Sequence, residues 1–203
     1  MKGINLNSLQ NDLYKAVRVN QVSPSLPFDH WDIDFLIDYI IHIHHQYLRH
    51  SLPLISDRLQ KFVEEHAVKY AWLPDLLNQF TRLNAVILPH LLHEEEFIFP
   101  YIRQISHAYQ SNESYASLLV RTLRKPVDEV MTYEHEMLFN TLQHFRVMTN
   151  NYSPPANACT SHQLVFSLLR ELDDDLAQHV YLENDILFPK AIALEKELLD
   201  RPA

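Results

Sequence analysis

Apolar residues recur along most of the chain at alternating spacings of three and four, the pattern of a helix that buries one face. Four stretches follow this pattern, and each carries polar residues at positions where the spacing calls for apolar ones. The stripes comprise Ile37, Ile41, His45, Leu48, Leu52, Ile55, Leu59 and Phe62; Leu76, Phe80, Leu83, Ile87, His90, Glu94, Phe97 and Tyr101; Val127, Met131, His135, Leu138, Leu142 and Phe145; and Leu172, Leu176, His179, Glu183 and Leu187.

Segments rich in Asn, Pro and Ser separate the stripes, as connections between helices do. They read "YAWLPD" at 70–75, "HAYQSNES" at 107–114 and "NNYSPPANACTS" at 150–161. Four long helices with short connections predict an all-α fold, an antiparallel up-down-up-down four-helix bundle. We expect this bundle over residues 31–200, after an irregular N-terminal lead-in at residues 1–30.

Prolines inside the helical patterns predict local kinks. Pro53, Pro89 and Pro100 each lie within a stripe region. A proline in a helix interior removes one backbone hydrogen bond, and its ring crowds the preceding turn.

The composition narrows the class of protein. A single glycine among 203 residues disfavours tight β-hairpins and phosphate-cradling loops, both of which need glycine. The formal net charge of −9 disfavours binding to nucleic acid or to anionic membranes. Cys159 has no second cysteine with which to form an intrachain disulfide, and no segment resembles a signal peptide or a membrane span. We therefore expect a cytoplasmic protein.

One unusual pattern of residues occurs twice. The stretches "HLLHEEEFIFP", which begins at His90, and "HVYLENDILFP", which begins at His179, each place Glu four residues after His. Phe and Pro then follow five and six residues after the Glu. His45 and His135 are also 90 residues apart, so the bundle is expected to contain two helical hairpins of the same design.

The spacing of the stripe histidines predicts that they meet. They are separated by 45, 45 and 44 residues, so in an antiparallel bundle each helix travels the same distance to its turn and back. A glutamate four residues after a histidine lies on the same helix face. Six candidate ligands therefore converge at one height in the core: His45, His90, Glu94, His135, His179 and Glu183.

A metal centre explains these residues better than a purely structural core. An isolated buried carboxylate costs several kcal/mol unless it is paired, and no stripe Lys or Arg lies near this height. Imidazole and carboxylate without thiolate suit iron, and less specifically manganese or zinc. Two glutamates can bridge two metals and leave two histidines for each. An oxo or hydroxo bridge and an exogenous ligand can then occupy the remaining positions.

Several stretches resemble the hemerythrin-like (HHE cation-binding) family, four-helix bundles with a non-haem di-iron centre. They are "HHQYLRHSLP", "HLLHEEEFIFP", "VMTYEHE", "NNYSPPANACTS" and "DDLAQHVYLENDILFP", within residues 33–195. The set is most similar to the bacterial iron–sulfur cluster repair proteins, although their small N-terminal cysteine-pair domain has no counterpart here. The resemblance implies that the four stripe histidines are terminal iron ligands and that Glu94 and Glu183 are bridging carboxylates.

Other positions refine this resemblance. Oxygen-carrying members have a second histidine one turn after the first on the third helix, where this chain has Phe139. A simple oxygen carrier is therefore disfavoured. His66 lies 21 residues after His45, about 31 Å along a continuous helix, and is left out of the ligand set. We expect Glu134 to hydrogen-bond to a ligating histidine. The remaining expectations place His42, His44 and His50 at the surface or as donors near the ligands, and Phe97, Phe99 and Phe188 in the core.

The resemblance implies a di-iron protein that repairs or protects iron–sulfur clusters under nitrosative or oxidative stress, by iron donation or NO chemistry. Two alternatives stay open: an O2-, NO- or redox-sensing module without catalysis, and a di-iron enzyme such as a peroxidase or NO reductase. The expected partners are O2, NO or a related small molecule, and iron–sulfur proteins or a cluster scaffold. Neither nucleic acid nor membrane is expected as a partner, and association into a homodimer is left open.

Overall fold

The computed structural model describes residues 26–123 and 127–200, which contain helices, turns and no strand. Three of the elements are π-helical turns that continue directly from one α-helix into another. In chain order the elements are η1 (Phe28–His30, a 3-10 turn), α2 (Ile33–Tyr39), η2 (Ile40–His45, π), α3 (Gln46–His66), α4 (Leu73–His93), η3 (Glu94–Ile98, π), α5 (Phe99–Gln110), α6 (Ala116–Leu123), α7 (Val127–Met148), α8 (Thr160–Leu182), η4 (Glu183–Leu187, π) and α9 (Phe188–Asp200).

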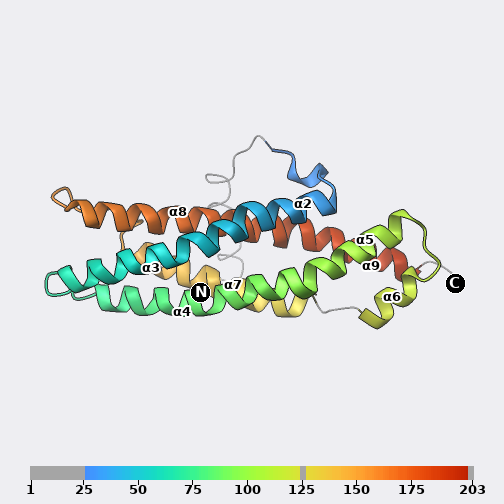
Figure 1. Ribbon diagram of the computed structural model, residues 1–203, viewed down its shortest axis with the longest axis horizontal. Coiled ribbons are helices and arrows are strands. Elements are labelled where there is room, and N and C mark those ends of the chain that lie inside the picture. Colours follow the sequence, from blue (N-terminus) through green and yellow to red (C-terminus); the bar gives the residue numbers. More distant parts are fainter. Residues whose placement is uncertain (1–25, 124–126, 201–203) are drawn as a thin grey trace, which may run out of the picture.

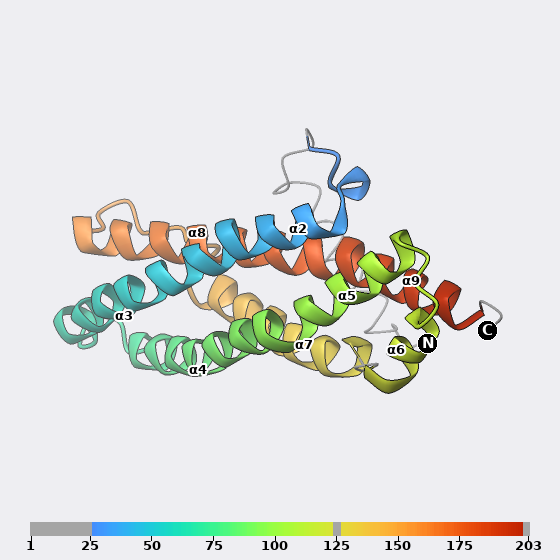
Figure 2. The same ribbon diagram turned by 45° about the vertical axis from the view of Figure 1, so that its right-hand side comes forward.

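These elements form four rods, and successive rods run in opposite directions (Figure 1). The rods are α2–η2–α3, α4–η3–α5, α7 and α8–η4–α9. α3 packs against both α4 and α8, and α4 packs against α7 (Figure 2). The predicted all-α antiparallel bundle is confirmed. Residues 1–25 of the predicted lead-in lie outside the described residues, and the domain boundary at residue 30 stays a prediction.

The third rod, α7, begins at Val127 and contains the whole of its predicted stripe. The short helix α6 precedes it in the chain and packs against α5 and α9 at one end of the bundle (Figure 2). The sequence has Pro126 between the two elements, and proline has no backbone N–H for a helix interior.

The π turns explain why two residues of the predicted buried stripes, Phe97 and Ile41, are less buried than their neighbours Ile98 and Ile40. In a π turn each N–H bonds the carbonyl five residues earlier, so the helix holds one additional residue. In η3 this extra residue moves the buried face forward: Ile98 is 2% exposed, whereas Phe97 is 48% exposed. The prediction that Phe97 belongs to the core was therefore wrong. In η2 the same effect buries Ile40 completely and leaves Ile41 only half-buried.

Two of the π turns precede a proline. Pro100 and Pro189 are the second residues of α5 and α9, directly after η3 and η4. A proline cannot bond the carbonyl four residues earlier, and a widened turn accommodates that loss. By contrast, α3 and α4 continue as α-helices through Pro53 and Pro89.

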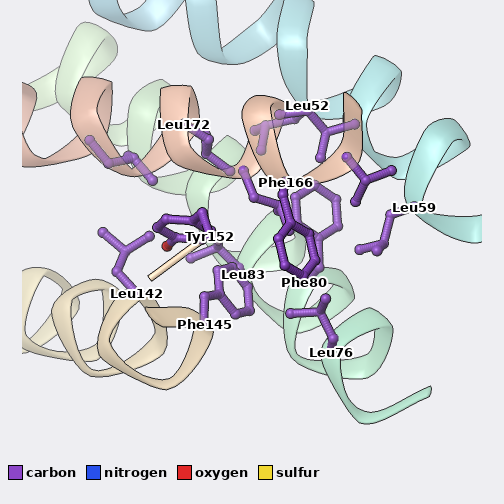
Figure 3. Close-up of a cluster of buried hydrophobic side chains, with 14 of the residues drawn as sticks. Leu52, Leu59, Leu76, Phe80, Leu83, Leu142, Phe145, Tyr152, Phe166 and Leu172 are labelled. Carbon is purple, nitrogen blue, oxygen red and sulfur yellow. The ribbon is translucent and has the colours of Figure 1, made fainter. Parts of the chain in front are cut away.

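The buried apolar side chains of the described residues form two separate clusters. One is built from α3, α4, α8 and the second half of α7, and contains Phe80 and Phe145 with ring centroids 6.5 Å apart (Figure 3). The other is built from α2, α5, α6 and α9. On the rods α2–η2–α3, α4–η3–α5 and α8–η4–α9 the predicted ligands lie at the boundary between the clusters, so a polar layer separates two apolar cores. Within the described ranges, no helix is long and apolar enough to cross a membrane.

Candidate metal centre

The structure brings all six predicted ligands together in that polar layer. They form two groups of four, and both groups contain Glu94 and Glu183. In each group one ligand atom from every residue lies within 4.8 Å of the others. The first group adds His45 and His179, the second adds His90 and His135, and all six side chains are buried. The equal spacing in the sequence thus corresponds to a single site contributed by four rods.

The two carboxylates lie between the two groups. Glu94 places Oε1 3.2 Å from Nε2 of His90 and Oε2 3.5 Å from Nε2 of His45. Glu183 places Oε1 2.9 Å from Nε2 of His179 and Oε2 3.3 Å from Nε2 of His135. Each glutamate therefore turns one oxygen toward each group, which is the arrangement of a bridging ligand.

The histidines of each group also face one another through Nε2. These atoms are 3.1 Å apart in His45 and His179, and 3.2 Å apart in His90 and His135. Metal–nitrogen and metal–oxygen bonds are about 2.0–2.2 Å long, so neighbouring ligand atoms of one ion lie about 3 Å apart. The spacing in both groups fits a small cation.

Three of the four carboxylate oxygens lack a hydrogen-bond donor among the described residues. Both oxygens of Glu94 and Oε2 of Glu183 are buried without a hydrogen-bond donor among the residues that the structure describes. Within those residues, no Lys or Arg forms an ion pair with either glutamate. Unpaired buried carboxylates cost several kcal/mol, and bound cations remove that cost. The donor set therefore fits metal ions.

The electrostatics of the site distinguish the two carboxylates. Burial, together with the nearby Glu183, raises the pKa of Glu94 well above its usual value. Burial also acts to raise the pKa of Glu183, but His179 and His135 outweigh it and bring that pKa well below the usual value. Burial lowers the pKa of His45 and of His90 to about 4. These two histidines are therefore neutral at pH 7, in the form that binds metals.

Three of the four histidines donate a hydrogen bond from Nδ1, the ring nitrogen that faces away from the centre, to a side-chain oxygen. His45 donates to Oε1 of Glu95 at 2.6 Å, an oxygen that also accepts from Arg49. His135 donates to Oδ1 of Asn184 at 2.9 Å. Such bonds fix the tautomer in which the Nε2 lone pair faces the centre.

The third outer partner is Glu134, as expected. His90 donates Nδ1 to Oε2 of Glu134 at 2.5 Å, across two helices, whereas the neighbouring His135 uses Asn184. Sequence reasoning missed Glu95 and Asn184. Their signal was present, because each immediately follows one of the two repeated glutamates.

The phenylalanines of the repeated pattern cover the imidazoles of neighbouring rods. Phe99 stacks on His45 with ring centroids 5.6 Å apart, and Phe188 stacks on His135 at 6.3 Å. Both phenylalanines are buried, as predicted. The repeated sequence thus supplies, in order, a histidine, a carboxylate, a π turn and an apolar cover.

The remaining histidines divide into buried and exposed positions. His42 and His50 are exposed, as expected, but His44 is buried and its Nδ1 donates to Oδ1 of Asp175 at 2.8 Å. His66 lies at the far end of α3, where Nδ1 donates to the Phe62 carbonyl and Nε2 lies 3.3 Å from Sγ of Cys159. Its exclusion from the ligand groups agrees with this position.

Comparisons with known proteins support this description. Residues 36–191 match the model of the hemerythrin HHE cation-binding domain. The chain is 32% identical over 160 residues to iron-sulfur cluster repair protein YtfE of Enterobacter sp. (strain 638), and shows the same identity to the proteins of that name from Escherichia coli O81 (strain ED1a) and Escherichia fergusonii. Each alignment covers 79% of this chain and 66% of the relative, so the chain spans about two thirds of those proteins. With a family match over most of its length and a buried His/Glu centre able to hold metal, the chain belongs to the hemerythrin HHE cation-binding family.

Proposed function

We propose that the six buried residues bind two iron ions. One position is held by His45 and His179, the other by His90 and His135, and Glu94 and Glu183 bridge both positions. The observation that carries this proposal is the orientation of the two carboxylates, each with one oxygen toward each histidine pair. The absence of thiolate from the ligand groups favours iron, with manganese or zinc as substitutes that the same donors accept.

The proposed role is repair or protection of iron–sulfur clusters under nitrosative or oxidative stress. It is supported by the relatives, which are named iron-sulfur cluster repair proteins. It is also supported by the ligand count, because two imidazoles and two shared carboxylates would leave room at each metal ion for a further ligand. The partners in this role are an iron–sulfur protein or a cluster scaffold that receives iron, and NO or O2 as the small-molecule ligand. The proposal places the protein in the cytoplasm, where a lone thiol such as Cys159 stays reduced.

The protein's own residues would prepare the site for this chemistry. The low pKa of His45 and His90 keeps their Nε2 lone pairs available at neutral pH. Outer acceptors hold three of the rings in orientation, and Phe99 and Phe188 shield His45 and His135 from water. Bound iron would supply redox chemistry and open coordination positions for a small ligand.

Iron transfer tests this role directly. The iron-loaded protein is incubated with an apo cluster scaffold, sulfide and a reductant, and cluster formation is followed optically. We expect faster assembly than with the same amount of free iron and chelator. Equal rates would refute donation. The control is His66→Ala, which alters a histidine outside the centre and should transfer iron like the wild type. Stoichiometric NO binding without any iron transfer would favour the sensing alternative.

A further inference from the structure

His179 differs from the other three histidines of the centre. Its Nδ1 is buried and has no direct acceptor among the described residues, whereas the other three Nδ1 atoms donate to Glu95, Glu134 and Asn184. A ligating histidine almost always donates its second N–H. The surroundings of His179 should therefore contain a substitute acceptor.

A hydrogen-bonded pair, the buried His44 and the half-buried Asp175, lies beside this ring. The His44 ring is parallel to the His179 ring within 7°, with centroids 5.8 Å apart. His44 is only 1% exposed and donates Nδ1 to Oδ1 of Asp175 at 2.8 Å. Asp175 precedes His179 by four residues on α8, which places both side chains on one helix face. The pair is therefore held against the ring that lacks an acceptor.

The pair carries unused hydrogen-bonding capacity. Within the described ranges, Nε2 of His44 and Oδ2 of Asp175 are buried without partners, as is Nδ1 of His179. Because His44 donates through Nδ1, its Nε2 is an acceptor. The three adjacent side chains thus present one donor, the His179 N–H, and two acceptors.

We infer that His44 and Asp175 hold an internal water that completes the hydrogen bonding of His179. One water satisfies all three atoms, because it accepts from Nδ1–H of His179 and donates to Nε2 of His44 and Oδ2 of Asp175. Buried waters typically make about three such bonds. His44 and Asp175 are then positioning residues for the His45/His179 position alone. This inference rests on the proposed metal centre, but does not depend on iron transfer.

Metal release from the zinc-loaded protein tests the inference. Zinc loss to an excess of chelator is followed in wild type and in Asp175→Asn, with zinc content measured beforehand. We expect two phases of equal amplitude in the wild type, and Asp175→Asn should accelerate one of them about 10–100-fold, as the loss of an outer partner does. Glu134→Gln should accelerate the other phase, because Glu134 holds His90 of the second position. The matched control is Glu171→Gln, the same charge change at an exposed site one turn earlier on α8, which should leave both phases unchanged.

A second variant and an NMR measurement distinguish the loss of the hydrogen bond to His179 from a general disturbance of the fold. His44→Phe keeps a ring against His179 but removes the acceptor nitrogen, and should accelerate the same phase as Asp175→Asn. In ¹⁵N-histidine NMR spectra of the zinc-loaded protein, both variants should shift the Nδ1–H resonance of His179 and leave that of His90 in place. Unchanged release, or equal acceleration of both phases, would overturn the inference. A wild type that binds no zinc would instead refute the metal centre itself.

Discussion

The shared carboxylates predict that the ligands respond unequally to substitution. His45→Ala removes an imidazole from only one of the two groups, whereas Glu94→Ala removes a carboxylate from both. Metal content should therefore fall to about half in His45→Ala and toward zero in Glu94→Ala, because each ion depends on its complete set of ligands.

The same difference should appear in thermal stability. A metal at about 100 times its Kd adds about 2.7 kcal/mol to the free energy of unfolding. Each kcal/mol raises Tm by about 2–4 °C in a chain of this size, so two ions should raise the wild-type Tm by about 10–20 °C. For His45→Ala we expect about half of that increase, and for Glu94→Ala almost none.

Two measurements check this prediction. Metal content is determined by mass spectrometry after anaerobic loading and gel filtration, and Tm is measured by circular dichroism with and without metal. His66→Ala serves as the control and should behave like the wild type, since His66 lies outside both groups. Glu94→Ala could instead retain as much metal as His45→Ala and show the same rise in Tm when metal is added. In that case Glu94 does not bridge the two metal positions.

Two further predictions concern residues away from the centre. Asp173 is buried and accepts two hydrogen bonds from Arg146 at 2.5 and 2.6 Å, so Asp173→Leu should lower the free energy of unfolding in urea by about 3–5 kcal/mol. The double variant with Arg146→Met should recover much of that loss, and equal losses in the single and double variants would contradict the pairing. Hydrogen bonds from the Ser161 hydroxyl and a backbone N–H, with a contribution from His66, lower the pKa of the exposed Cys159 to about 7. Alkylation of Cys159 should therefore reach half its maximal rate near pH 7 and need a higher pH in His66→Ala; a midpoint near pH 9 in the wild type would contradict this.

The four-helix architecture could be predicted from the spacing of apolar residues, and the convergence of the candidate ligands from the number of residues between the histidines. Equal intervals between histidines translate into equal heights in an antiparallel bundle, whatever the details of packing. The π turns could not be predicted in this way, because a stripe read at spacings of three and four assumes an uninterrupted α-helix. Phe97 and Ile41 were assigned to the core for this reason, and the structure buries Ile98 and Ile40 instead.

Residue spacing alone could not predict which histidine each outer residue would contact. Glu134 pairs with His90, 44 residues away, and His44 pairs with Asp175, 131 residues away. Such pairs depend on how one helix is rotated against another, and a hydrophobic stripe defines that rotation only within the width of the stripe. For His44 the sequence therefore left two positions open, the surface or a place beside the ligands, and the structure buries it beside the centre.

The division of the apolar interior into two clusters bears on how the protein opens. Without metal, the halves of the bundle are joined across a layer of buried ionisable groups, so each half can form its own cooperative unfolding unit. Hydrogen exchange should then report different opening energies for α5 and α9 than for α3 and α4, and a single opening energy once metal spans the layer. Under the proposed role in iron donation, the metal-free protein would be the form most accessible to proteases and chaperones, which act on chains that open locally.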